Sequence, residues 1–186
     1  MSTEYPDHPF WNFSIKVYAG KGVSHACINI QERHHMDVNL LLLGTWYGAS
    51  GRGRLSYNQL NKVIEITSKW NKEIVCNLRS VRTRLKDRVE GFPMNQTEAI
   101  RKAVLSMEVE CEHIEQLAIA KCLGDKALGS DNLTAGRIED SVDNILCYFH
   151  IKKVCPTDFD LNDLSIILKS AYPKKNENSI KETLIR

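Results

Sequence analysis

The stretch Asp37-Val-Asn-Leu-Leu-Leu-Leu-Gly-Thr-Trp-Tyr-Gly-Ala49 decides the fold, because it is apolar on nearly every side. A helix of this kind lies either inside a protein or inside a membrane. A bilayer span needs about 20 apolar residues, and this run is shorter, so we expect a helix enclosed by other helices. Asp37 is suited to cap its N-terminus. Asn39 falls in the buried first turn, so we expect its amide to bond to the backbone or to Gln31.

Helical periodicity continues on both sides of this central stretch, and no strand pattern occurs. Apolar side chains recur at helical spacing over residues 10–18, 23–34, 56–67, 74–85, 97–124, 138–149 and 161–171. The sequence therefore predicts an all-α globular bundle of six to eight helices around the buried helix 37–49. We expect a helical core domain over residues 1–125. A polar linker at 126–132 would lead into a helical extension, 126–186, packed on the core, with a polar tail from about 174 that docks weakly or frays.

The helix predicted at 97–124 has a regular apolar stripe. Its members are spaced 4, 3, 4, 3 and 4 residues apart, which is the spacing of a coiled-coil seam: Ile100, Val104, Met107, Cys111, Ile114 and Ala118. The simplest interpretation is a packing face inside the molecule. The pattern at 74–85 is interrupted or kinked where it joins the preceding helix, around residues 69–71.

Composition excludes several classes of protein. The 186 residues include 25 Lys and Arg against 23 Asp and Glu, so net charge does not indicate nucleic-acid binding. The six cysteines form no C-x-x-C pair and are typical of reduced, buried thiols. The first residues have neither the basic start nor the apolar core of a signal peptide. We therefore expect a soluble cytoplasmic protein without a cofactor.

Several short stretches of the first 125 residues resemble a family of uncharacterised bacterial proteins, a domain of unknown function. The resemblance rests on residues 10–15, 17–18, 22–23, 26–27, 31–33, 37–42, 46, 70 and 78–86. It names relatives and implies no activity. The chain departs from the family pattern at His35, where we expect glycine. Such a position requires a left-handed backbone, which His tolerates better than most residues.

Two Glu-x-x-His motifs, Glu32–His35 and Glu110–His113, have the spacing of a di-iron carboxylate site. On helical wheels, however, their side chains do not converge, and we expect no metal centre. Catalysis is not favoured either. Cys111 and His113 point about 200° apart on one helix, and the glycines at 48, 51 and 53 lack the Lys-Ser/Thr of a phosphate-binding loop.

The most unusual signal is basic. Residues 52–90 hold ten Lys and Arg against four Asp and Glu. The candidate partner-binding residues are Arg52, Arg54, Lys72, Arg79, Arg82 and Lys86. The alternative is that these charges pair with the acidic middle of the next helix, at Glu108, Glu110, Glu112 and Glu115, in a solvated fringe where each pair contributes little.

Three functions remain. The first is a non-enzymatic interaction module whose basic face binds an acidic protein partner. The second is nucleic-acid or ribosome binding by the same face, although it has few aromatic residues for base stacking. The third is small-molecule binding or catalysis in a pocket near the buried helix, with candidate residues Gln31, His34, Asp37, Asn39 and Trp46.

Overall fold

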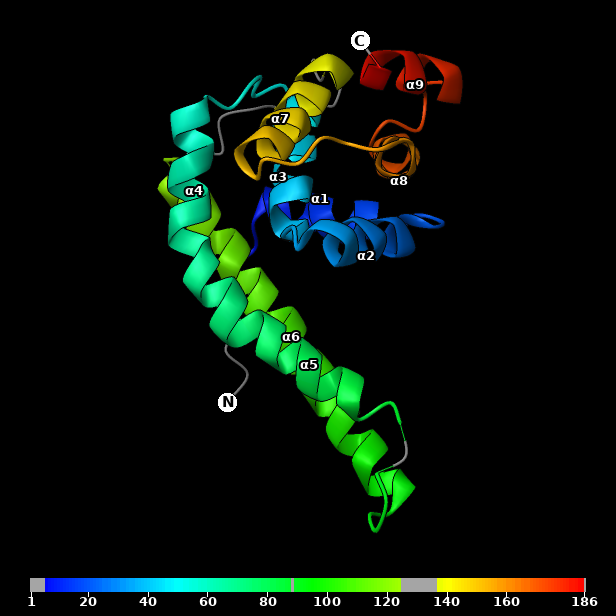
Figure 1. Ribbon diagram of the computed structural model, residues 1–186. Helices are drawn as coiled ribbons and strands as arrows, with labels where there is room; N and C mark the ends of the chain where they lie inside the picture. The colour runs from blue at the N-terminus through cyan, green and yellow to red at the C-terminus, as the bar shows by residue number, and fades with distance from the viewer. Residues whose placement is uncertain (1–5, 88, 125–136, 186) are drawn as a thin grey trace.

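The computed structural model describes residues 6–87, 89–124 and 137–185, and every regular element in them is helical (Figure 1). This confirms the predicted all-α fold. The linker expected at 126–132 lies outside the described residues. The elements are α1 (Pro9–Tyr18), α2 (Val23–His34), α3 (Val38–Ala49), α4 (Tyr57–Trp70), the π-helix η1 (Asn71–Val75), α5 (Cys76–Arg84), α6 (Met94–Cys122), α7 (Ile138–Ile151), α8 (Asp158–Ala171) and α9 (Glu177–Ile185).

Helix α3 is the buried centre of the bundle, as predicted. Leu41 and Leu43 are completely inaccessible to solvent. Asp37 caps the helix, because its Oδ1 accepts from the backbone N–H of Asn39 at 2.8 Å. His35 adopts the expected left-handed backbone (φ 51°), which lets the chain turn sharply between α2 and α3.

Helix α7 covers α3 more extensively than any other element does. Gly48 makes the approach possible, because a Cβ there would lie 2.3 Å from both the backbone nitrogen and the Oγ of Ser141. The Ser141 hydroxyl donates to the carbonyl of Thr45 (2.8 Å), and Asn144 Nδ2 donates to that of Gly44 (3.3 Å). The two helices are therefore joined by direct hydrogen bonds as well as by apolar packing.

The C-terminal segment is better packed than its sequence indicates. The tail predicted to be polar and weakly docked forms α9, in which Ile180 and Leu184 are buried in the main core. Two apolar side chains four residues apart lie on one helical face, so this short helix can bury both while its polar residues face solvent.

Helices α4, η1 and α5 follow one another without a break and form a rod antiparallel to α6 (Figure 1). The interruption expected near residue 70 is the π-turn η1 rather than a break. Helix α6 begins at Met94, three residues earlier than its expected cap Thr97. No helix within the described ranges is long and apolar enough to cross a membrane.

Candidate functional site

The rod and α6 extend together beyond the rest of the bundle as a two-helix arm (Figure 1). We define the arm as residues 71–115, and no residue of α5 within it is buried. In this region α6 buries Glu108 and Glu115, while Ile100 and Met107 of the predicted seam remain exposed. The seam is therefore not the interior packing face that its spacing predicts.

A cluster of buried and half-buried polar groups connects the arm to α3. We call it the polar junction and define it as Asp37, the N-cap of α3, and Asn39 in its first turn, with Glu112, Glu115 and Gln116 of α6. Asn39 is its centre: Nδ2 donates to Glu115 Oε2 (2.8 Å), and Oδ1 accepts from Gln116 Nε2 (2.8 Å). Of the two partners expected for the Asn39 amide, the backbone is found, because Nδ2 also donates to the carbonyl of Glu112 (3.4 Å). Gln31 is not a partner of Asn39 and accepts from Arg79 instead.

The carboxyl groups of Asp37 and Glu115 lie close enough to each other for a hydrogen bond. Asp37 Oδ2 and Glu115 Oε1 are buried and have no N–H donor within the described part of the chain. Two facing carboxyls satisfy each other only when they share a proton. Burial, followed by the charge of Asp37, raises the pKa of Glu115 to about 9, and burial also raises the pKa of Asp37. We assign the shared proton to Glu115, because Asp37 accepts a backbone N–H bond that favours its ionised form.

A layer of ion pairs lies beside the polar junction and is more open to solvent. The Arg79 guanidinium donates to Glu108 (2.8 Å), Glu112 (2.6 Å) and Gln31 (2.6 Å), and Arg82 also donates to Glu108. Burial raises the pKa of Glu112 to about 7, against the opposing effect of Arg79. Arg79 therefore ties α5 to both α6 and α2.

The five residues predicted to form a ligand pocket do not meet in one place. Asp37 and Asn39 belong to the polar junction, and Gln31 reaches its edge through Arg79. His34 instead contacts Asp160 of α8, at 2.9 Å. Trp46 stacks on Phe10, with their ring centroids 5.0 Å apart, in the apolar core.

Asp160 is the centre of a second, separate ionic cluster. It accepts from His34, and Arg33 pairs with it and with Asp163. Burial opposes ionisation of this carboxylate, but hydrogen bonds from Thr157, His34 and Arg33 outweigh it and lower the pKa of Asp160 to about 2. Thr157 and Asp160 form the capping box of α8, so this cluster holds α8 against α2.

Most of the predicted basic face is occupied inside the molecule. Arg79 and Arg82 pair with Glu108 and Glu112 of α6. For these two arginines the structure therefore has the ion pairs that the alternative interpretation of the basic residues predicts. Arg54 pairs with Asp140 and Asp143 of α7, and Arg52 lies over the Trp46 ring. Only the two lysines of the set, Lys72 and Lys86, are exposed with no ion pair to any described residue.

No group of three or more His, Cys, Asp or Glu side chains in residues 6–87, 89–124 and 137–185 is arranged to hold a metal ion. His113 stacks on Trp11 (4.1 Å between ring centroids), and His35 lies in the α2–α3 turn. The two Glu-x-x-His motifs therefore do not form a common site.

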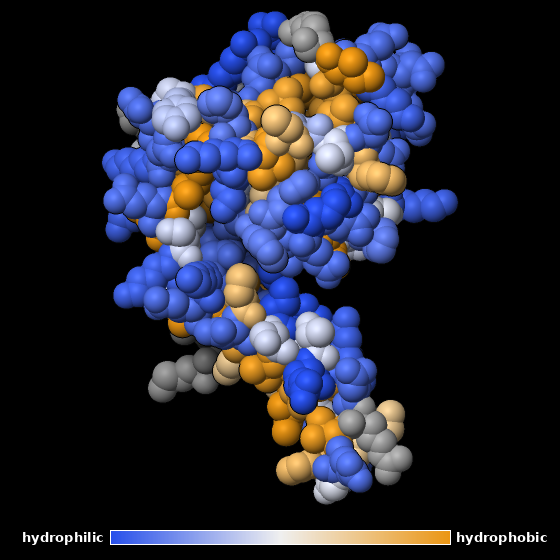
Figure 2. Space-filling model, in the orientation of Figure 1, coloured by the Kyte–Doolittle hydropathy of each residue, from blue (hydrophilic) through white to orange (hydrophobic). Residues whose placement is uncertain are grey.

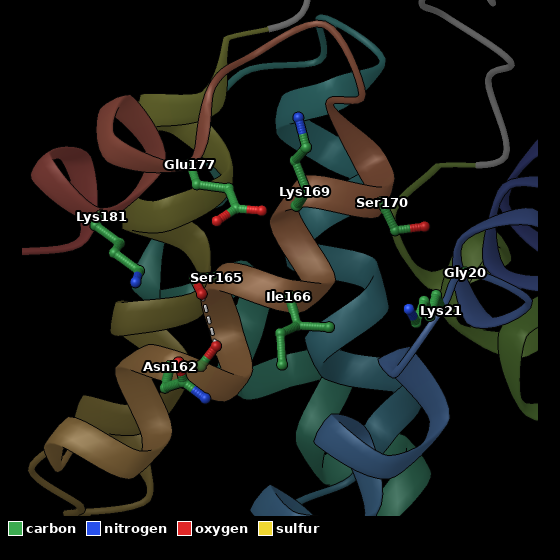
Figure 3. Close-up of a pocket in the computed structure, with 9 residues that line it drawn as sticks. All are labelled: Gly20, Lys21, Asn162, Ser165, Ile166, Lys169, Ser170, Glu177 and Lys181. Atoms are coloured by element: carbon green, nitrogen blue, oxygen red, sulfur yellow. Dashed lines mark hydrogen bonds between the residues drawn. The ribbon is translucent and has the colours of Figure 1, made fainter.

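The sequence did not predict a groove of about 380 Å³ between the α1–α2 turn, α8 and α9 (Figure 3). Lys21, Lys169 and Lys181 line it, together with Glu177. Lys169 donates to two loop carbonyls, those of Pro173 and Lys175, and so fastens the connection between α8 and α9. The lining side chains are all exposed or half-buried, and we assign no ligand to this groove.

Together these features define an all-α domain with a projecting helical arm and a buried carboxyl pair at the base of that arm. The chain belongs to the family described as "Protein of unknown function (DUF2390)", whose model matches residues 9–119. The match spans α1–α5 and most of α6, so it includes the whole arm, whereas α7, α8 and α9 lie beyond it. No match was found among curated proteins or among solved structures.

Proposed function

We propose that this chain is a non-enzymatic protein-interaction module that binds an acidic partner through its arm. The supporting observation is the apolar surface that the arm leaves uncovered. Val81 is 49% exposed, Met107 59% and Phe92 64%, and Ile74, Met94, Ile100, Leu105 and Val109 are exposed as well. Figure 2 shows apolar side chains at the surface along the arm. Soluble monomers rarely leave large apolar patches open unless these bind something.

The spacing of these side chains favours a helical partner. Along η1 and α5 the apolar positions are 74, 78, 81 and 85, and along α6 they are 100, 104, 107 and 111. Both series have the coiled-coil period. Two helices alone cannot enclose two such seams, and another amphipathic helix is the usual complement of an apolar helical groove.

Nucleic-acid binding by the same face has less support. Phosphate contacts need several available cations, and Arg79 and Arg82 already pair with Glu108 and Glu112. Exposed apolar side chains add nothing to phosphate binding. A small-molecule site near Asp37 and Asn39 also has less support, because these side chains bond to other parts of the protein.

We propose that the module acts in the cytoplasm of a bacterium. All six cysteines are free, and Cys76 and Cys155 are exposed. Unpaired thiols are typical of proteins kept in a reducing compartment.

A photo-crosslinking amino acid placed at Val81 tests the proposal in living cells. The matched control places it at Phe159 of α8, an apolar residue away from the arm that is 75% exposed. We expect a discrete protein adduct from position 81 and none from position 159. Equal labelling at the two positions, or no adduct at 81, would refute the proposal. A nuclease-sensitive adduct would replace it with the nucleic-acid alternative.

A further inference from the structure

The charges of the arm divide unequally between its two halves. The distal half, residues 83–107, contains five Lys and Arg against three Asp and Glu. The proximal half, residues 71–82 and 108–115, contains three Lys and Arg against five Asp and Glu. Glu115 carries the shared proton, so four of these five acids are ionised. The distal half therefore carries two positive units and the proximal half one negative unit, on the same two helices.

We infer that the partner of the arm is a second copy of this chain, docked antiparallel so that two arms form a four-helix bundle. The inference rests on the proposed function. It identifies the acidic partner as the proximal half of the arm of a second copy. Antiparallel docking places each basic distal half against an acidic proximal half, and it does so twice. Parallel docking would place like charges together, which costs free energy.

The charges needed for this contact are available at the surface. Arg84 and Lys86 in the distal half are exposed, as are Glu73 and Glu110 in the proximal half. None of the four has an ion pair to another described residue. In contrast, the proximal arginines, Arg79 and Arg82, are held by Glu108 and Glu112. The exposed charges of the proximal half are therefore Glu73 and Glu110 against Lys72.

The apolar seams fit the same arrangement. Each arm contributes two antiparallel helices whose seams are covered only on one side, and four-helix bundles bury such seams around a shared core. From Met94 to Glu115, α6 is about 30 Å long at 1.5 Å per residue, enough for several layers of side chains. Two identical patches related by a twofold axis are the commonest way in which soluble proteins associate.

Charge reversal in the full-length chain tests the inference, measured by sedimentation at pH 7 and low salt from about 1 to 200 µM. We expect the wild type to dimerise. The distal variant Arg84→Glu/Lys86→Glu and the proximal variant Glu73→Lys/Glu110→Lys should each weaken dimerisation at least tenfold. An equimolar mixture of the two should form a heterodimer, and the variant carrying all four changes should dimerise alone, because only antiparallel docking restores its charge match.

The matched control, Lys174→Glu/Lys181→Glu, changes two exposed lysines away from the arm and should leave dimerisation unchanged. A wild type that stays monomeric to 200 µM would overturn the inference. So would a dimer that tolerates both arm variants, or one that the fourfold variant does not restore. If the wild type is monomeric while position 81 crosslinks to a different protein, the inference fails and the proposed function stands. If position 81 gives no adduct, both fail.

Discussion

Glu115→Gln is the most informative single substitution in the polar junction. Glutamine has the shape of the protonated glutamic acid. Its carbonyl can accept from Asn39, and its amide can donate to Asp37, as the shared proton does in the wild type. Above the pKa of a free glutamate, the wild type must take up or retain a proton at this position in order to fold. The variant does not have this requirement.

The size of the effect follows from the two pKa values. The folded chain keeps the Glu115 proton up to about pH 9, whereas the unfolded chain releases it near pH 4.3. Between these pH values the folded state binds one more proton than the unfolded state does. The Glu115 carboxyl group therefore lowers the free energy of unfolding of the wild type by about 1.4 kcal/mol for each pH unit of increase. From pH 5 to pH 8 the free energy of unfolding of the wild type therefore falls by at most about 4 kcal/mol through this group. The protein can rearrange around an ionised Glu115, which reduces the loss to about 2 kcal/mol at the lower end.

Urea unfolding of both proteins from pH 5 to pH 8 measures this difference directly. We expect the stability of Glu115→Gln relative to wild type to rise steadily with pH by about 2–4 kcal/mol. Glu112, whose pKa is also raised, to about 7, contributes equally to both proteins and cancels. The control Glu98→Gln removes an exposed carboxylate of α6 that pairs with Arg101, and its difference from wild type should stay flat. A flat or falling curve for Glu115→Gln would show that Glu115 is ionised in the folded state.

Three further substitutions test other parts of the fold by urea unfolding. Gly48→Ala should destabilise the chain by about 3 kcal/mol, because its Cβ would overlap Ser141 of α7; a loss below about 0.5 kcal/mol would contradict the close approach. Ile180→Ala should cost about 2–4 kcal/mol, whereas Ile185→Ala, at an exposed position of the same helix, should cost little; equal losses would mean that α9 is not docked. Asp160→Asn should be less stable than wild type by about 2 kcal/mol above pH 4, and the gap should close as pH falls towards 2, where the wild-type carboxylate with its lowered pKa takes up its proton.

The sequence predicted those features that short-range rules control. An uninterrupted apolar run placed α3 in the centre, a side-chain oxygen before it identified the Asp37 cap, and the departure from glycine at His35 marked the left-handed turn. The first two depend on one residue and its near neighbours in the chain, and the third on the resemblance to a family pattern that has glycine at this position. For that reason the helical class and most helix positions were recognisable without tertiary information.

The polar junction was missed because α6 has different neighbours along its length. Its C-terminal half lies against the bundle and buries Glu108, Glu115 and Gln116, with the half-buried Glu112 on the same stripe, whose spacing is also helical. We interpreted these acids as a surface fringe, because the more regular apolar seam indicated the packing face. Only the path of the chain in space decides that the polar stripe faces α3 and the arginines of α5 while the seam stays open.

The covering of α3 by α7 has a consequence for how this family is defined. The segment shared with relatives ends at residue 119, yet one wall around its most apolar helix comes from residues 138–151. The stretch that defines the family is therefore shorter than the set of helices that encloses its most apolar helix. A chain ending at residue 119 would leave the α7-facing side of α3, around Gly44 and Gly48, uncovered.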